Sequence, residues 1–172
     1  MIRMAKTLYL LVAGIFLNTA SSAAQDVESR TYSIMLSGLL SRTVPEADVL
    51  EIAKDTQNMV FLDAREKAEF DVSHIKNAVW IGYDDFKMNR LNGISKDAEI
   101  IVYCSVGYRS EKITQKLQEA GFKNAKNLYG GIFEWVNQDQ EVVNNTDQPT
   151  QKVHGFDKFW GVWLKKGEKV YD

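Results

Sequence analysis

Four short apolar runs separated by helix-like segments constrain the fold of this chain more than any other feature. The runs cover residues 59–63, 78–82, 99–104 and, more weakly, 125–131. Residues 110–120, between the last two runs, have helical spacing, with Ile113 and Leu117 on one face. Buried apolar strands that alternate with helices are typical of a parallel sheet covered on both faces. The sequence therefore predicts one α/β domain.

Two further helices are predicted before the first apolar run. Residues 27–40 have one apolar side, which consists of Tyr32, Met35, Leu36, Leu39 and Leu40. Pro45 is well placed to open a second helix, because proline is favoured at the first helical position. The apolar face of that helix would consist of Val49, Ile52 and Ala53.

The first 24 residues have the layout of a secretory signal peptide. Arg3 and Lys6 precede an apolar block at residues 8–17, and small residues follow up to Ala24, with Gln25 next. The block is too short to span a bilayer comfortably, which favours cleavage near Ala24 over a membrane anchor. We expect an exported protein, either periplasmic or secreted, without a transmembrane segment in the mature chain.

Composition and charge exclude other classes of protein. A chain of 172 residues that is 45% hydrophobic can bury a core and is too apolar to be disordered. The formal net charge is −2, and the predicted signal peptide contains basic but no acidic residues, so the mature chain is more acidic. An acidic chain without a basic stripe predicts that nucleic acid is not a partner.

The only cysteine, Cys104, falls where an apolar run ends and a helix is about to begin. Ligands bind at the carboxyl ends of strands in open α/β sheets, and a helix start offers unpaired N–H groups and the positive end of its dipole. Gly107 permits the turn that brings those amides inward, and Arg109 adds a positive charge. A buried structural cysteine needs none of this. The pattern favours a reactive thiolate.

Three motifs in order resemble the signatures of the rhodanese-like sulfurtransferase family. They are "FLDAREKAEFDVSHIKNAVWIGY" at residues 61–83, "CSVGYRS" at 104–110 and "NLYGGIFEWV" at 127–136. The resemblance implies the rhodanese fold, a largely parallel five-stranded sheet flanked by helices on both faces. It places a rhodanese domain at residues 44–140, a helical extension at 25–43 and a C-terminal extension at 141–172.

The resemblance also implies a reaction and its residues. Cys104 would attack the outer sulfur of thiosulfate or a related donor, hold the sulfur as a persulfide and pass it to a thiol or cyanide. The expected donor-binding residues are Ser105, Val106, Gly107, Tyr108, Arg109 and Ser110 in the loop, with Asp63 and Arg65 nearby. No metal or organic cofactor is implied. Four residues separate Cys104 from Arg109, one fewer than in cysteine phosphatases, and the tighter ring suits sulfur better than phosphate.

Several roles remain open at the level of sequence. Asp63 and Arg65 serve the donor and the loop, form an ion pair that ties neighbouring loops together, or do both. His74 is expected to be structural, because an ionised thiolate needs no general base. Gly130, Gly131 and Trp135 are expected to shape the turn beside the active loop.

The C-terminal extension is expected to pack on its own domain. Phe156, Phe159, Trp160, Trp163 and Leu164 have helical spacing, so the extension would present one apolar helical face, with the helix at 27–40 as a docking partner. The alternatives are a membrane-surface helix or a partner-binding helix.

The alternative to an enzyme is a rhodanese-fold module that binds a partner or delivers sulfur to a protein thiol without turning over thiosulfate.

Overall fold

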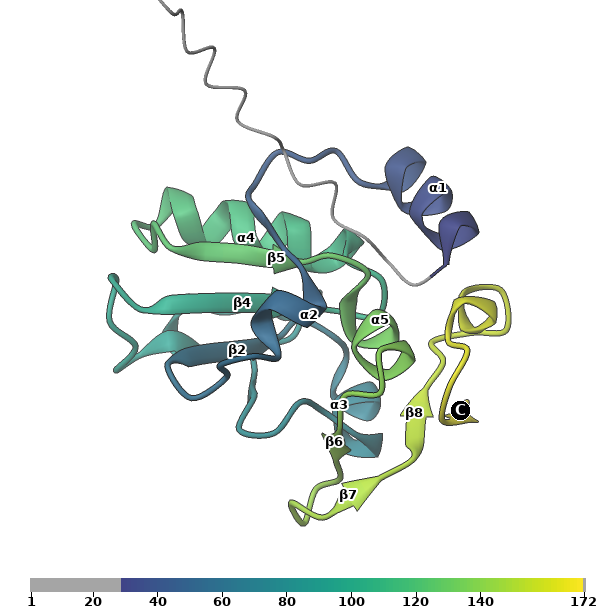
Figure 1. Ribbon diagram of the computed structural model, residues 1–172. Helices are drawn as coiled ribbons and strands as arrows, with labels where there is room; N and C mark the ends of the chain where they lie inside the picture. The colour runs from purple at the N-terminus through teal and green to yellow at the C-terminus, as the bar shows by residue number, and fades with distance from the viewer. Residues whose placement is uncertain (1–28, 172) are drawn as a thin grey trace, which may run out of the picture.

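A five-stranded parallel sheet forms the centre of the protein (Figure 1). The computed structural model describes residues 29–171, so the predicted signal peptide lies outside the described residues. The strands are β1 (Glu46–Ala47), β2 (Met59–Asp63), β3 (Val79–Trp80), β4 (Glu99–Tyr103) and β5 (Ala125–Leu128). Their order is β1-β5-β4-β2-β3, and each neighbouring pair is parallel. The predicted fold class is confirmed.

Helices cover both faces of this sheet (Figure 1). They are α1 (Arg30–Leu39), α2 (Val49–Ile52), α3 (Lys67–Val72), α4 (Tyr108–Glu119) and α5 (Gly131–Asn137), with short 3₁₀ helices η1 (Met88–Leu91) and η2 (Trp160–Trp163). Helix α4 packs on one face, and α1, α2 and α5 contribute to the core on the other. No helix within residues 29–171 is long and apolar enough to cross a membrane.

Alternation along the central strands explains why β2 and β4 are mostly apolar. In β4, Ile100 and Val102 belong to the core beneath α4, whereas Ile101 and Tyr103 belong to the opposite core. Successive side chains of a strand point to opposite faces, so a strand covered on both sides reads as a nearly continuous apolar run. Because both faces of β4 are buried, its carboxyl end has a fixed position in the fold.

The start of the domain differs from the sequence prediction, because Pro45 does not open a helix. Residues Glu46–Ala47 instead pair with β5 as an edge strand, and the carbonyl of Pro45 accepts a hydrogen bond from the amide of Asn127 at 2.9 Å. The helix begins at Val49, where the side chain of Asp48 caps it by accepting two backbone N–H bonds. Pairing with the sheet overrides the helix-start preference of proline.

The C-terminal extension also differs from the prediction of one helical face. It contains β6 (Val142–Val143), β7 (Pro149–Thr150), β8 (Lys152–His154) and β9 (Glu168–Val170). Strands β8 and β9 are parallel, and η2 lies between them in the chain. Gly155 and Gly161 lie against the ring of Tyr171, and a Cβ at either position would collide with that ring. The close approach of Tyr171 explains why glycine occupies both positions.

The apolar side chains of the extension divide between surface and core. Phe159 is 72% exposed and Phe156 is 44% exposed, whereas Leu164 is fully buried. Trp163 stacks on Tyr32 of α1, with ring centroids 5.3 Å apart. The carbonyl of Trp163 also accepts a hydrogen bond from the side chain of Asn137 in α5 at 2.9 Å. The N-terminal and C-terminal extensions therefore contact each other on one side of the domain.

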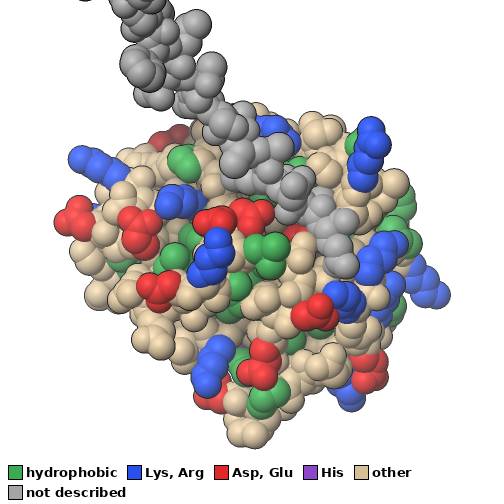
Figure 2. Space-filling model, viewed as in Figure 1, with side chains coloured by type: hydrophobic (Ala, Val, Ile, Leu, Met, Phe, Trp, Pro, Cys, Tyr) green, Lys and Arg blue, Asp and Glu red, His purple; other side chains and the backbone are tan. Residues whose placement is uncertain are grey.

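Charged side chains of both signs share the surface. On the face shown in Figure 2, Lys and Arg side chains lie among Asp and Glu side chains. Exposed pairs such as Lys54 and Glu51, with Nζ and Oε1 2.6 Å apart, are part of this pattern. The mixture agrees with the small formal net charge of −2.

Replacing Tyr32 with phenylalanine tests how α1 is attached. The Tyr32 hydroxyl donates a buried hydrogen bond to the carbonyl of Gly130 at 2.8 Å, and the substitution removes it while the ring can still stack. We expect Tyr32→Phe to lower the free energy of unfolding by about 1 kcal/mol in urea titrations. The control Tyr171→Phe, at a ring that is 36% exposed, should change it little. Equal effects of the two variants would contradict this account.

Candidate active site

Cys104 lies on the loop that joins β4 to α4. Strand β4 ends at Tyr103 and α4 begins at Tyr108, so the thiol lies at the carboxyl edge of the sheet. Gly107 caps the helix with φ of +113°, in the left-handed region that favours glycine. The sequence predicted this position of the thiol between strand and helix.

Two groups of the loop approach the sulfur of Cys104. The amide of Gly107 donates a hydrogen bond to Sγ at 3.2 Å, and the hydroxyl oxygen of Ser110 lies 3.5 Å from Sγ. That hydroxyl also lies 2.7 Å from Oδ1 of Asn127, so its single proton is shared between alternative acceptors. The side-chain amide of Asn127 holds the carbonyl of Gly107 at 3.1 Å. The sulfur therefore has polar partners that suit an anion.

The first turn of α5 holds the Cys104 loop in place through two backbone hydrogen bonds. The amide of Ile132 donates to the carbonyl of Cys104 at 2.8 Å, and that of Phe133 donates to the carbonyl of Ser105 at 3.1 Å. The C=O and N–H of a trans peptide point in opposite directions, so the amides of Ser105 and Val106 face away from α5. Neither amide donates a hydrogen bond to another residue within the described part of the chain. Both are available to a bound anion.

Gly131 allows α5 to come this close to the loop. It has φ of +59°, and a Cβ built there would lie 2.7 Å from the backbone carbon of Ser105. No other amino acid fits this space without displacing the loop backbone. The sequence prediction that Gly130 and Gly131 shape the turn agrees with this contact.

Arg109 pairs with Glu69 of α3, a residue that the sequence analysis did not identify. Its two terminal nitrogens donate to the two carboxylate oxygens at 2.7 and 2.8 Å, and Nη2 also donates to Oγ of Ser105 at 2.9 Å. The Ser105 hydroxyl in turn donates to Glu69 at 2.9 Å. The three side chains form a closed network that joins α3 to both ends of the loop.

The network changes the pKa values of both charged members. Burial alone would raise the pKa of Glu69, but hydrogen bonds from Arg109 and its positive charge outweigh burial and lower that pKa. Burial would lower the pKa of Arg109, but hydrogen bonds to Glu69, the nearby sulfur of Cys104 and the negative charge of Glu69 raise it. Both side chains are charged at neutral pH, and their charges compensate each other.

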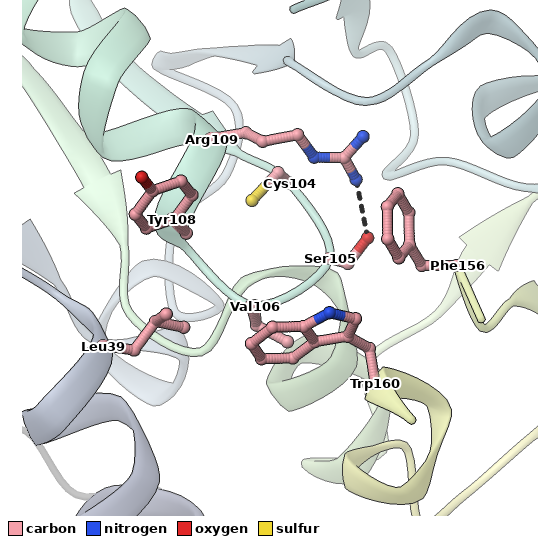
Figure 3. A pocket seen from close by; sticks show the side chains of 8 residues that line it. All are labelled: Leu39, Cys104, Ser105, Val106, Tyr108, Arg109, Phe156 and Trp160. Atoms are coloured by element: carbon pink, nitrogen blue, oxygen red, sulfur yellow. Dashed lines mark hydrogen bonds between the residues drawn. The ribbon is translucent and has the colours of Figure 1, made fainter. Parts of the chain in front are cut away.

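The loop opens into a cavity of about 480 Å³. Its lining residues are Leu39, Cys104, Ser105, Val106, Tyr108, Arg109, Phe156 and Trp160, and the Cys104 sulfur lies inside the ring of these side chains (Figure 3). Cys104 is 1% exposed, so the thiol lies at the base of the cavity rather than on the surface. The arrangement presents a sulfur nucleophile to a small molecule in a largely apolar pocket.

Asp63 and Arg65 are not among the residues that line this cavity. Both side chains are fully buried, and they form an ion pair in which Nη2 and Oδ2 are 2.6 Å apart. Arg65 also donates to the carbonyl of Ser73 at 2.6 Å. This geometry favours the structural interpretation, in which the pair ties neighbouring loops together. His74, which stacks on Phe70 with ring centroids 3.9 Å apart, is likewise absent from the cavity lining.

The remaining predicted residues converge on the loop, but sequence reasoning missed part of the walls. Ser105, Val106, Tyr108 and Arg109 line the cavity, and Gly107 and Ser110 contact the sulfur. The missed wall residues are Leu39, Phe156 and Trp160, which come from the two extensions. Their apolar spacing was visible in the sequence, but no local signal showed that they meet Cys104.

The family model of the rhodanese-like domain matches residues 46–138, which is more than half of the chain. The chain therefore belongs to the rhodanese-like domain family. This membership supports an enzyme of the rhodanese superfamily. The matched segment includes the Cys104 loop, Glu69 and α5, and it excludes the three wall residues from the extensions.

Individual relatives share the domain rather than their full length. The tRNA uridine(34) hydroxylase of Pectobacterium carotovorum strain PC1 is 32% identical over 98 residues, which is 54% of this chain and 28% of that protein. The protein of the same name from Enterobacter sp. strain 638 is 31% identical over 121 residues, 63% of this chain and 35% of that protein. The chain thus spans only a minor part of these curated relatives.

Solved structures show the same fold. A Bacillus halodurans protein aligns with a TM-score of 0.54 at 24% identity, covering 66% of this chain and 84% of that chain. A thiosulfate sulfurtransferase from Pseudomonas aeruginosa aligns with a TM-score of 0.51 at 24% identity, covering 62% of this chain and 21% of that chain.

Substituting Gly131 tests whether α5 positions the loop. Gly131→Ala introduces a Cβ into the backbone of the loop and places alanine at positive φ, so it should lower the free energy of unfolding by at least about 2 kcal/mol. The control Gly38→Ala, in α1 with nothing within 4 Å of its Cβ, should raise that free energy by about 0.5–1 kcal/mol. Urea titration measures both. A neutral Gly131→Ala would contradict the close contact.

Acid titration tests the ion pair between Arg109 and Glu69. Because the pKa of Glu69 is lowered in the folded protein, its contribution to stability is present above its ordinary value of 4.5 and is lost as pH falls below it. We expect Glu69→Gln to cost about 3 kcal/mol at pH 7, the low end for breaking a buried pair. It should also lose less stability than the wild type on acidification to pH ~3.

The exposed pair of Glu51 and Lys54 provides the matched control. Both side chains are mostly exposed, so Glu51→Gln should change the free energy of unfolding by less than about 0.5 kcal/mol. The free energy of unfolding of Glu69→Gln could instead fall as steeply with acidification as that of the wild type. That result would show that Glu69 is not the cause of the pH dependence.

Proposed function

We propose that this protein transfers a sulfane sulfur from a small donor to a thiol or cyanide acceptor, carrying it as a persulfide on Cys104. The observation that carries the proposal is the position of the sulfur at the base of the 480 Å³ cavity, with the Gly107 amide 3.2 Å from Sγ. Membership of the rhodanese-like domain family supports the same reaction class.

The chemistry proceeds in two displacement steps. The Cys104 thiolate attacks the outer sulfur of the donor, and the bond to that sulfur breaks with its electron pair on the leaving group. With thiosulfate the leaving group is sulfite. An acceptor thiolate or cyanide then attacks the outer sulfur of the persulfide, and the Cys104 thiolate returns. The sulfur moves between nucleophiles, so we assign no metal or organic cofactor to the reaction.

The loop amides stabilise the negative charge on sulfur in both steps. The free amides of Ser105 and Val106 and the amide of Gly107 are donors that can follow the negative charge from the thiolate to the outer persulfide sulfur. Because α5 fixes the carbonyls of Cys104 and Ser105, these donors need little reorganisation. Arg109 and Glu69 serve as positioning residues that hold the loop to α3.

We further infer that the acceptor is a small thiol, cyanide or a protein thiol rather than RNA. The curated relatives are named for tRNA, but this chain spans 28% of the Pectobacterium protein. The formal net charge of −2 and the mixed charges of the face in Figure 2 support a partner other than a polyanion. We also propose export, which rests on the layout of residues 1–24.

Mass spectrometry after donor treatment tests the proposed function. The purified protein, incubated with excess thiosulfate or methanethiosulfonate, should gain one sulfur atom, and cyanide should remove it as thiocyanate. Cys104→Ser should gain none, because Cys104 is the only thiol of the chain. No sulfur gain from either donor, while Cys104 remains open to alkylation, would contradict the proposal. It would instead favour a partner-binding module.

A further inference from the structure

The two extensions enclose the space in front of Cys104 with apolar side chains. Leu39 comes from α1, and Phe156 and Trp160 come from the segment between β8 and β9 (Figure 3). All three lie outside residues 46–138, the part of the chain that matches the rhodanese-like domain. These three wall residues are therefore contributed by this chain's extensions, whereas the other lining residues belong to the family domain.

The positive charge of Arg109 at the cavity is compensated by the negative charge of Glu69. Arg109 is the one cationic side chain among the described residues that line it. Both terminal nitrogens of Arg109 are paired with Glu69, whose side chain is 3% exposed, and the ring of Phe156 lies 4.9 Å from the guanidinium carbon. A ligand in this cavity thus meets backbone amides but no uncompensated cation.

The apolar walls and the compensated charge make the free energy of binding differ between classes of donor. A dianion such as thiosulfate loses its hydration and gains no free positive charge in return. An apolar body gains from contact with Leu39, Val106 and Trp160, because apolar surface is removed from water on both sides. The volume of about 480 Å³ lies in the range of small-molecule pockets and exceeds what a single sulfur atom requires.

We propose that the cavity selects an organic sulfane sulfur donor, in which the transferable sulfur is attached to an apolar aliphatic or aromatic body with at most one negative charge. This inference rests on the proposed function and adds the substrate class of the same site. Leu39 and Trp160 are the specificity-determining residues, and the loop amides receive the sulfur end of the donor.

Benzenethiosulfonate is a suitable probe of this class. The Cys104 thiolate attacks the terminal sulfur, a new bond forms between the two sulfurs, and benzenesulfinate leaves with the electron pair of the broken S–S bond. Thiolate and thiosulfonate carry one negative charge each, and persulfide anion and sulfinate do the same, so no oxidant is needed. Cyanide then takes the outer sulfur as thiocyanate, which allows turnover to be followed.

The experiment compares three donors with cyanide as the common acceptor. These are benzenethiosulfonate, methanethiosulfonate and thiosulfate, and each kcat/KM is divided by the rate of the same donor with a free thiol in buffer. We expect benzenethiosulfonate to exceed methanethiosulfonate by roughly tenfold or more, as for several methylene-sized contacts in an apolar pocket, and thiosulfate to be the poorest.

Variants of the wall assign the preference to residues. Trp160→Ala should reduce the ratio of benzenethiosulfonate to methanethiosulfonate by roughly tenfold, because it removes the aromatic wall. Val162→Ala is the matched control, since Val162 lies in the same 3₁₀ helix, is 49% exposed and does not line the cavity. If Trp160→Ala fails to fold, Leu39→Ala tests the part of the wall that α1 contributes and should reduce the ratio in the same direction.

The outcomes separate this inference from the proposed function. If no donor yields thiocyanate or a persulfide, the proposed function itself fails. If methanethiosulfonate or thiosulfate turns over as well as benzenethiosulfonate, sulfur transfer stands and the inferred substrate class is overturned. The same holds if the ratio is unchanged in a folded wall variant.

Discussion

The contact between the active loop and the start of α5 is the constraint on which the site depends. The amides of Ile132 and Phe133 hold two loop carbonyls, and the missing side chain of Gly131 permits this distance. Because the carbonyls face α5, the amides of Ser105 and Val106 face the other way. The same contact therefore fixes the loop and supplies donors for a sulfur anion.

A second layer of interactions supports this loop and closes the space in front of it. Glu69 and Arg109 connect α3 to the start of α4, while Tyr32 and Trp163 stack the two extensions together. The extensions thus do more than cover the sheet, because they bring Leu39 and Trp160 to the cavity. The family domain provides the nucleophile, and the extensions add Leu39, Phe156 and Trp160 to the apolar wall.

Features with a local cause could be predicted from the sequence, and features with a distant cause could not. The double burial of β2 and β4 makes their sequences apolar, and the strand-to-helix position of Cys104 follows from the neighbouring patterns. Strand β1 is only Glu46–Ala47 and depends on β5 for its conformation, so it leaves no periodic signal. Glu69 meets Arg109 across 40 positions, and Trp160 reaches the cavity only after the tail folds back.

The central claim is that the loop amides receive the outer sulfur of a persulfide, and amide resonances measured by NMR before and after persulfidation test it most directly. The account predicts that the largest shift changes occur at Ser105, Val106 and Gly107, and that cyanide reverses them. Persulfidation that leaves these three amides unchanged, with its main shift changes elsewhere in the described chain, would contradict the account.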